Sequence, residues 1–246
     1  MKFFLAPMQG LTGYTVRNAF HHHFDYIDKY YTPFIPAAKR MNAKIKRDID
    51  PVNNDGITLI PQAMSIVADE VIDLHRQLVP YGYDEINVNL GCPSGTVVSK
   101  KRGSGILAYP DMLDSFLDEL YTKADFPVSI KTRVGFNDDE LWPKLIEIYS
   151  KYPISELTVH PRVQKDFYKN TPRMDDFALA MQKINPDKTI LCYNGDITDT
   201  NSFNALTDCF PDIDEIMIGR GLFANPALIA ELKGISMDKA ELRDCL

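Results

Sequence analysis

Eight short apolar runs, rich in β-branched and aromatic residues, recur along the chain, and most are separated by stretches with helical spacing. The runs cover residues 3–6, 26–32, 58–63, 85–89, 128–132, 156–160, 189–194 and 215–218. Strands that alternate with helices about every 25–40 residues form parallel sheets, because a parallel connection has to cross over the sheet. Eight such units in 246 residues predict an α/β fold, the closed (β/α)8 TIM barrel, with an open doubly wound sheet as the alternative.

Four of the intervening stretches place apolar residues on one face of a helix, at residues 67–78, 112–120, 141–149 and 174–184. Residues 33–54 differ, because they show no clean amphipathic pattern. Three consecutive histidines, His21, His22 and His23, fall in a helical stretch, where neighbouring side chains point in different directions. We therefore expect that they do not share a metal ion, and we predict no metal site.

Composition argues against several other classes of protein. With 45% hydrophobic residues the chain can bury a core, and no apolar run approaches the about 20 residues of a membrane-spanning helix. The four cysteines, Cys92, Cys192, Cys209 and Cys245, include no CxxC pair, which argues against a disulfide framework and a zinc site. Pro7 interrupts the first apolar residues too early for a signal peptide. We expect a cytoplasmic protein without membrane contact.

The net charge of −7 by itself argues against a nucleic-acid partner, but the positive charges are unevenly distributed. Windows 39–47, 100–102, 131–133 and 160–173 hold 14 of the 27 lysines and arginines and a single acid, Asp166. Each window begins at or soon after the end of a predicted strand, and in a TIM barrel these ends share one face. We expect the windows to converge around the barrel mouth and attract a polyanion. The alternative for any single window is a solvated surface.

Chemically capable polar residues follow most of the predicted strands, at the end of the barrel where active sites are built. They include Gln9, Gln62, Asn89, Cys92, Lys131, Arg133, His160, Arg162, Asn194, Asp196 and Arg220. Each residue type has a structural explanation when taken singly, since asparagines cap helices and buried cysteines are most often inert apolar side chains. Their gathering at one end of the barrel predicts an active site.

The loops after the last two predicted strands indicate a phosphate site. In barrels these loops often bind phosphate through backbone amides and a helix N-terminus. Residues 194–196 read Asn-Gly-Asp and residues 219–221 read Gly-Arg-Gly, so glycines allow close backbone approach and Arg220 offers a guanidinium to phosphate oxygens. No GxGxxG follows a strand, so a Rossmann dinucleotide site is not indicated. A single phosphate on a barrel cofactor suits FMN; the alternative is two glycine turns with a surface arginine.

Six motifs in order make the chain resemble the tRNA-dihydrouridine synthases, flavoenzymes that reduce particular uridines in tRNA. The motifs lie at residues 6–12 (APMQGLT), 89–93 (NLGCP), 131–133 (KTR), 160–162 (HPR), 194–196 (NGD) and 218–221 (IGRG). The resemblance extends from Phe3 to Pro226. Any one of these motifs is weak, but six of them in the right order and spacing are specific.

The resemblance implies a set of cofactor-binding residues: Pro7, Met8, Gln9, Gln62, Lys131, His160, Asn194, Gly195, Asp196, Gly219 and Arg220. Within this set, Gln62 is expected at the isoalloxazine edge, Lys131 at its N1/O2 side and His160 beside flavin and substrate. The resemblance also implies that Asn89 and Arg162 contact the target uracil. The basic rim, with Lys100, Lys101 and Arg102, is expected to hold the phosphates of the tRNA around that base.

The expected reaction reduces the C5–C6 bond of uracil to 5,6-dihydrouridine. Reduced FMN is expected to deliver a hydride from N5 to C6, so the protein has to provide a proton at C5. The resemblance assigns this proton to Cys92, and a thiol with a pKa of about 8.5 is mostly protonated at neutral pH. Lys131 is expected to stabilise anionic reduced flavin. A uridine in folded tRNA has to be swung out of its stack to reach such a site.

Two features depart from the family pattern. Gly13 stands where an aspartate commonly follows the threonine of the first motif. Family members usually continue into a C-terminal helical domain, and the sequence ends at Leu246. We expect residues 1–230 to form the FMN-binding catalytic barrel and residues 231–246 to begin a helical segment that is truncated or absent. We also expect a monomer that takes electrons from NADPH or NADH.

Two other functions fit parts of the pattern. A barrel flavoenzyme for a free pyrimidine or another small conjugated substrate would share the flavin site but would need no basic rim. A non-catalytic RNA-binding barrel would need none of Cys92, Lys131 and His160 at the barrel base.

Overall fold

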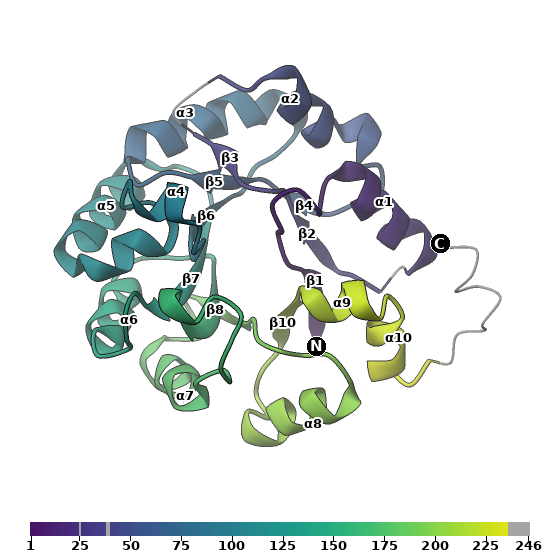
Figure 1. The fold of residues 1–246 in the computed structure, drawn as a ribbon. Coiled ribbons are helices and arrows are strands. Elements are labelled where there is room, and N and C mark those ends of the chain that lie inside the picture. The colour runs from purple at the N-terminus through teal and green to yellow at the C-terminus, as the bar shows by residue number, and fades with distance from the viewer. Residues whose placement is uncertain (25, 38–39, 236–246) are drawn as a thin grey trace.

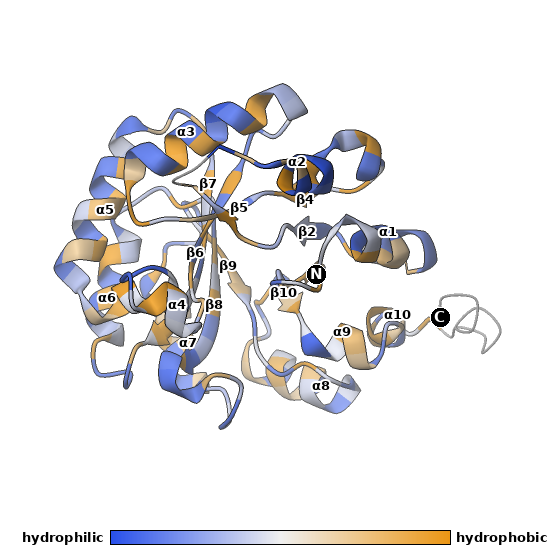
Figure 2. Cartoon of the chain, turned by 45° about the horizontal axis from the view of Figure 1, so that its top comes forward, coloured by the Kyte–Doolittle hydropathy of each residue, from blue (hydrophilic) through white to orange (hydrophobic). Residues whose placement is uncertain are grey.

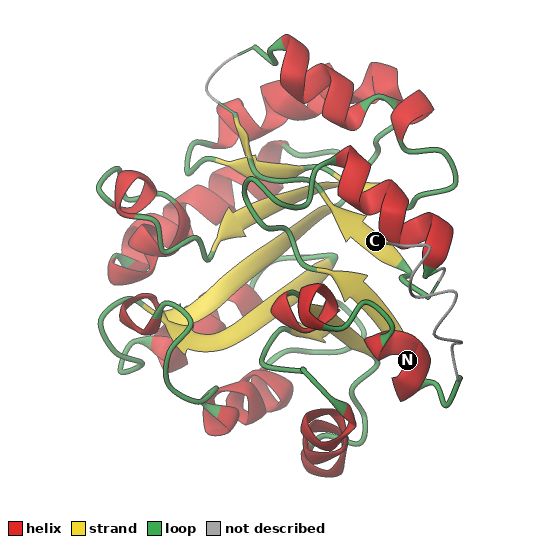
Figure 3. Ribbon diagram, turned by 45° about the vertical axis from the view of Figure 1, so that its right-hand side comes forward, coloured by secondary structure: helices red, strands yellow, loops and turns green. Residues whose placement is uncertain are grey.

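The computed structural model describes residues 1–24, 26–37 and 40–235. Ten short strands form one sheet in which all neighbours are parallel, in the order β3-β5-β6-β7-β8-β9-β10-β1-β2-β4. They are β1 (Lys2–Leu5), β2 (Lys29–Tyr31), β3 (Ile35–Pro36), β4 (Leu59–Ile60), β5 (Gln62–Met64), β6 (Ile86–Leu90), β7 (Val128–Gly135), β8 (Glu156–Val163), β9 (Ile190–Tyr193) and β10 (Glu215–Ile218). The strands make an inner ring with helices outside it (Figures 1 and 3).

The ring closes at Pro61, which separates β4 from β5. Strand β4 pairs with β2, whereas β5 pairs with β3 and β6, so the two ends of the strand order meet. Proline has no N–H for a strand ladder, which accounts for the interruption. The Pro61 carbonyl still accepts from Asn87 N at 2.9 Å. Nine of these ten strands overlap the eight predicted runs and β3 lies just after the second run, which confirms the TIM barrel and excludes the open sheet.

The predicted helical stretches are confirmed. They correspond to α3 (Ala68–Leu78), α5 (Pro110–Lys123), α6 (Trp142–Ser150) and α7 (Met174–Lys183). The other helices are α1 (Tyr14–His23), α2 (Ala43–Ile49), α4 (Gly95–Val98), α8 (Thr200–Cys209), α9 (Arg220–Ala224) and α10 (Leu228–Leu232). Short 3-10 helices are η1 (Pro51–Asn53), η2 (Val79–Tyr81), η3 (Gly103–Ala108) and η4 (Gln164–Asp166). The unpatterned residues 33–54 contain β3, α2 and η1.

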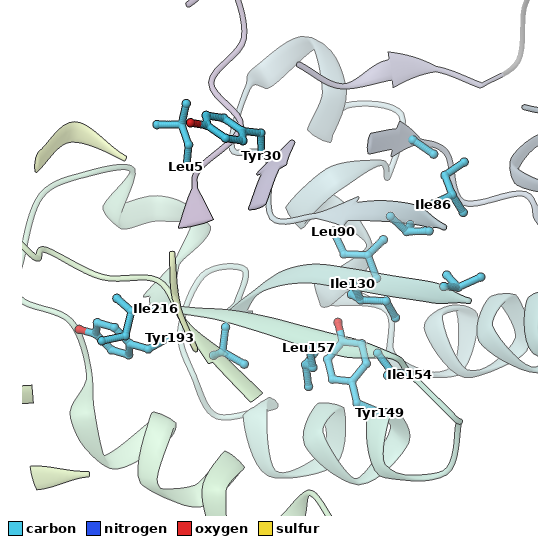
Figure 4. Close-up of a cluster of buried hydrophobic side chains, with 14 of the residues drawn as sticks. Leu5, Tyr30, Ile86, Leu90, Ile130, Tyr149, Ile154, Leu157, Tyr193 and Ile216 are labelled. Atoms are coloured by element: carbon cyan, nitrogen blue, oxygen red, sulfur yellow. The ribbon is translucent and has the colours of Figure 1, made fainter. Parts of the chain in front are cut away.

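The main apolar core lies between the strands and the helices. Leu90, Ile130 and Leu157, from β6, β7 and β8, are fully buried with Tyr149 of α6 (Figure 4). In Figure 2 the helices carry both orange and blue residues, as helices with one buried face do. Successive side chains of a strand point to opposite faces, so the residues between these apolar ones point into the barrel.

Polar side chains fill much of the barrel interior along β6, β7 and β8. These inward positions are Asn87, Asn89, Ser129, Lys131, Arg133, Glu156, Thr158 and His160. Several are hydrogen-bonded to one another, as buried polar groups need to be. For example, Asn87 Nδ2 donates to Ser129 Oγ at 3.0 Å, and Thr158 Oγ1 donates to Glu156 Oε1 at 2.8 Å. A polar interior of this kind suits a binding site at the barrel mouth.

No helix in the described part of the chain is long and apolar enough to cross a membrane. Cys92, Cys192 and Cys209 are free thiols, and Cys245 lies outside the described residues. The predicted C-terminal segment, 231–246, contains the end of α10, and its residues 236–246 also lie outside them.

Candidate active site

A cavity of about 550 Å³ opens among the carboxyl ends of the barrel strands. Its volume falls in the range of about 300–1,000 Å³ that is usual for small-molecule and cofactor sites. Most of the residues predicted for cofactor and substrate line it: Pro7, Met8, Gln9, Gln62, Asn89, Cys92, Lys131, His160, Asn194, Gly195, Asp196, Gly219 and Arg220. The fold thus brings these segments together, while the role of each residue stays a prediction.

The loop that follows β6 holds Cys92 at the cavity. Asn89 Oδ1 accepts from Gly91 N at 3.1 Å and from Cys92 N at 2.8 Å. The Cys92 carbonyl accepts from Ser104 Oγ at 2.8 Å. Gly103 has φ +54°, and a Cβ there would lie 2.7 Å from the same carbonyl, so only glycine fits this turn. Burial raises the pKa of the half-buried Cys92 thiol, which keeps it protonated at neutral pH.

A chain of buried side-chain amides supports this loop from below. Asn89 Nδ2 donates to Gln62 Oε1 at 2.7 Å, and Gln62 Nε2 donates to Asn87 Oδ1 at 2.8 Å. The chain ends on Ser129 of β7. Each amide in it fixes the orientation of the next, because a carbonyl oxygen can only accept and an amide N–H can only donate. Asn89 therefore orients the Cys92 backbone, whatever it contacts in the substrate.

Two basic side chains on the cavity floor have lowered pKa values, so they carry less positive charge at neutral pH than they would on a surface. Burial and the nearby Arg133 lower the pKa of Lys131 to about 7. Lys131 Nζ donates to Asn194 Oδ1. Burial, with Arg133 and Lys131 as nearby cations, holds the pKa of His160 well below its ordinary value, so its ring is neutral. Arg162 Nη1 lies 3.2 Å from His160 Nε2; because the guanidinium donates, the ring proton lies on Nδ1.

Arg133 connects two cavity loops, and no cofactor or substrate contact was predicted for it. Its Nε donates to Gly91 O at 2.9 Å, next to Cys92. Its other two nitrogens donate to Val163 O at 3.0 Å and to Phe167 O at 2.7 Å. Burial lowers the pKa of Arg133 to about 10, which leaves it charged at neutral pH. Strand alternation could have indicated this position: residues two apart on a strand share a face, and Lys131 on the same strand was predicted to contact the cofactor.

Arg162 lies behind the cavity wall and not among the lining residues. Its guanidinium is buried and pairs with the Asp196 carboxylate through both terminal nitrogens. It also donates to the carbonyls of Lys169 and Asn170. Arg220 Nη2 donates to the same Asp196 carboxylate at 2.6 Å, and the two arginines lower the pKa of Asp196. The predicted contact between Arg162 and the uracil stays a prediction, and the structure shows Arg162 holding the wall.

Aromatic side chains at the mouth were not predicted as contacts. Phe34, Phe167 and Tyr168 line the cavity, and Tyr168 is 54% exposed. The Arg220 guanidinium lies 5.0 Å from the centre of the Tyr168 ring, and that of Arg133 lies 5.8 Å from it. Phe167 has φ +51°, a strained backbone conformation for a bulky residue. Strain of this kind in an exposed aromatic residue beside a cavity is typical of a functional site.

The predicted basic rim is only partly exposed. Window 131–133 lies at the cavity, as predicted, but it adds no exposed charge to a rim, because Lys131 and Arg133 point into the barrel. Arg102 pairs with Glu70 at 3.1 Å, and Lys101 Nζ lies 4.4 Å from the centre of the Tyr109 ring. The exposed cations of the four windows include Lys44, Lys46, Arg47, Lys100, Lys101, Lys165 and Lys169. Lys100, Lys101 and Arg102 do not line the cavity.

The fold of this chain, a closed barrel with a polar cavity at the carboxyl ends of its strands, is similar to that of several solved structures. Morphinone reductase matches with a TM-score of 0.63 and 11% identity, over 98% of this chain and 88% of that one. The old yellow enzyme from Trypanosoma cruzi matches with a TM-score of 0.59 and 8% identity, over 98% and 90%. At these identities the similarity concerns the fold alone.

The chain belongs to the dihydrouridine synthase family, whose model matches residues 4–244. A "Probable tRNA-dihydrouridine synthase" of Staphylococcus aureus is 34% identical over 154 residues, which cover 61% of this chain and 46% of the relative. The "tRNA-dihydrouridine synthase B" of Pasteurella multocida is 26% identical over 243 residues, covering 95% of this chain and 69% of the relative. The match thus spans about half the length of the Staphylococcus relative. The resemblance found in the six motifs is confirmed.

Proposed function

We propose that residues 1–230 form the catalytic barrel of an oxidoreductase that reduces uridines of tRNA to 5,6-dihydrouridine with FMN as cofactor. The observation that carries the proposal is the position of Cys92 beside the cavity. Burial keeps this thiol protonated, and the cavity it faces also contains Lys131 and His160. A protonated thiol at a cavity that also holds the guanidinium groups of Arg133 and Arg220 suits a reaction that adds a hydride and a proton to a double bond.

The cavity fits a flavin mononucleotide in size and in charge. It contains Lys131, Arg133 and Arg220 against the single carboxylate of Asp196, which is already paired with arginines. At Gly219 the wall is bare backbone, since a Cβ there would lie 3.3 Å from Ala6 Cβ. We infer that Lys131 and Asn194 hold the ring side and that Arg220 and Gly219 hold the phosphate. When bound, FMN supplies the hydride.

The residues of the chain have separate tasks in this proposal. Cys92 holds a proton at Sγ and gives it to C5 of the uracil. Asn89 and Arg133 fix the Cys92 loop, through its backbone N–H and through the Gly91 carbonyl. His160 lines the cavity with a neutral ring whose proton lies on Nδ1. Exposed lysines outside the cavity, such as Lys100 and Lys101, attract tRNA phosphates around an extruded uridine.

The test has two parts. The purified protein should carry or take up FMN, with an absorption band near ~450 nm as flavins have. With FMN, a nicotinamide reductant and tRNA lacking dihydrouridine, it should form dihydrouridine, detected by mass spectrometry of nucleosides. Absence of FMN binding would overturn the flavoenzyme proposal. Reduction of a free pyrimidine with no activity on tRNA would instead favour the small-substrate enzyme. NADPH or NADH as reductant, a monomeric state and a cytoplasmic location stay predictions.

A further inference from the structure

We propose that Asp48, on α2, is a positioning residue for the cofactor cavity, because it anchors the loop between β1 and α1 through the buried Arg17. The inference rests on the proposed function, since this loop is taken to lie along FMN. It concerns a residue outside the cavity and outside the six motifs. Helices α1 and α2 lie on the same side of the barrel (Figures 1 and 2).

The anchored loop forms one wall of the cavity. Pro7, Met8, Gln9 and Leu11 line it. The loop folds back on itself, because Met8 N donates to Thr12 Oγ1 at 2.9 Å and Thr12 N donates to Met8 O at 3.1 Å. Its link to the interior is Arg17, whose Nη1 donates to Thr12 O at 2.7 Å. The position of the loop therefore depends on the position of the Arg17 guanidinium.

Arg17 is a fully buried cation that several oxygens hold in place. Asn54 Oδ1 accepts from its Nε at 3.2 Å and from its Nη2 at 2.9 Å. Asp48 binds it twice, with its carbonyl at 2.6 Å from Nη2 and its Oδ2 at 3.3 Å from Nη1. Burial lowers the pKa of Arg17, and the Asp48 carboxylate opposes that shift. Loss of the carboxylate would leave the buried charge without this counterion, which is strongly unfavourable.

Asp48 also caps the N-terminus of α1, because the N-cap residue Gly13 has no side chain that could do so. Gly13 is the N-cap residue of α1 and makes no side-chain cap. Instead Asp48 Oδ1 accepts from Tyr14 N, the first N–H of the helix, at 2.7 Å. One carboxylate from α2 thus satisfies both the start of α1 and the cation that holds the preceding loop.

The geometry at Gly13 makes the inference testable by rescue. A Cβ at Gly13 would lie 3.3 Å from Asp48 Oδ1 and meet no other atom within 4 Å. The backbone of Gly13 is extended, with φ −69°, which any residue adopts. An aspartate at position 13 would therefore crowd and repel Asp48, but it would have room if Asp48 were alanine. From the N-cap it could then bind the helix N-terminus and reach Arg17, four residues on.

The experiment is a double-mutant cycle, Asp48→Ala, Gly13→Asp and both together, with FMN affinity from flavin fluorescence and thermal unfolding as readouts. Asp48→Ala should weaken FMN binding about tenfold or more and lower Tm by roughly 5–15 °C. Gly13→Asp alone should weaken FMN binding as well. The double variant should recover to within about threefold of wild type, a sign of coupling that simple destabilisation would not produce.

Asp50→Ala is the matched control. Asp50 caps η1 through Val52 N at 3.0 Å and makes no side-chain bond to Arg17. It should leave FMN affinity unchanged. If Asp48→Ala does not fold, Asp48→Ser with and without Gly13→Asp takes its place, since serine removes the charge and its shorter side chain leaves room for the aspartate. Wild-type FMN affinity in an Asp48 variant, or a double variant no better than Asp48→Ala, would overturn the inference and leave the proposed function intact. A wild-type protein without FMN binding would instead overturn the proposed function.

Discussion

Lys131 and Asn194 are joined by a hydrogen bond across the cavity, from Nζ to Oδ1. The bond links β7 to the loop after β9, so it connects two of the segments that carry the predicted cofactor residues. Asn194 is held in turn, because its Nδ2 donates to Met217 O at 2.8 Å. Lys131 thus has one fixed neutral partner, and its charge is not balanced by a bonded carboxylate.

The first prediction concerns the pH dependence of stability. Between about pH 7 and pH 10.5 the unfolded chain keeps a proton on Lys131 that the folded chain has released. The free energy of unfolding contributed by this group therefore rises with pH through that window. Urea unfolding of the cofactor-free protein at pH 7 and pH 9 should show a smaller rise for Lys131→Met than for wild type. An equal rise in both proteins would contradict the low pKa.

Asp176, at the start of α7, should act in the opposite direction. Burial and the adjacent Asp139 raise its pKa to about 7, and its Oδ2 is buried without a hydrogen-bond partner. Between about pH 4 and pH 7 the folded chain holds a proton that the unfolded chain has lost, so stability falls as the pH rises. Asp176→Asn should raise Tm at pH 8 and change it less at pH 5. The control is Asp208→Asn, an exposed acid on α8, which should do neither.

Arg220 should bind the phosphate of FMN. It is half-exposed at the cavity and oriented by Asp196, so it offers charged donors that an anion can share. Removal of a charge-assisted hydrogen bond costs about 1.5–3 kcal/mol. Arg220→Ala should thus weaken FMN binding about tenfold or more in a fluorescence titration. The FMN affinity of Arg220→Lys should lie between that of wild type and that of Arg220→Ala. Riboflavin affinity should stay unchanged, because only FMN carries the phosphate, and an equal loss for both flavins would count against the assignment.

The exposed lysines after α4 should contact tRNA phosphates. Arg102 is paired with Glu70, so the sharper test reverses only Lys100 and Lys101 to glutamate. tRNA affinity should fall, and the slope of log affinity against log salt should flatten by about 0.7–0.9 for each phosphate that the variant no longer binds. The control is Lys183→Glu with Lys188→Glu, two exposed lysines near the start of β9 at the opposite end of the barrel, of which Lys183 has only a long contact of 3.9 Å to Glu147. An equal fall in affinity for both pairs would indicate net charge alone.

The barrel could be predicted from the sequence because its strands and helices have short-range patterns. Apolar runs, helical stripes and polar residues at strand ends each lie within a few neighbouring positions. The same holds for Lys131 and His160, whose place on their strands puts them in the interior. Residues 33–54 were not assigned, because α2 is only seven residues long and buries a single residue, Ile49.

The residues that hold the site in place could not be found in this way. Arg133 and Arg162 have the same sequence signal, a basic residue at a strand end, but one lines the cavity and the other lies behind it. The difference depends on Asp196, which lies on the loop after β9 and pairs with Arg162. Asp48 lies on α2, which had no clear pattern, and it binds Arg17 from 31 positions away. Such long-range contacts leave no periodic trace in a single sequence.

The most direct test of the central claim is dihydrouridine formation by Cys92→Ala, measured by mass spectrometry on tRNA that lacks the modification. The account predicts normal FMN binding, normal reduction of the flavin by the nicotinamide, and a fall in product of roughly 10²–10⁴-fold, the effect of losing a general acid. Cys209→Ala, which removes an exposed thiol outside the cavity, should retain full activity. Full activity of Cys92→Ala would contradict the account and leave that thiol a packing residue.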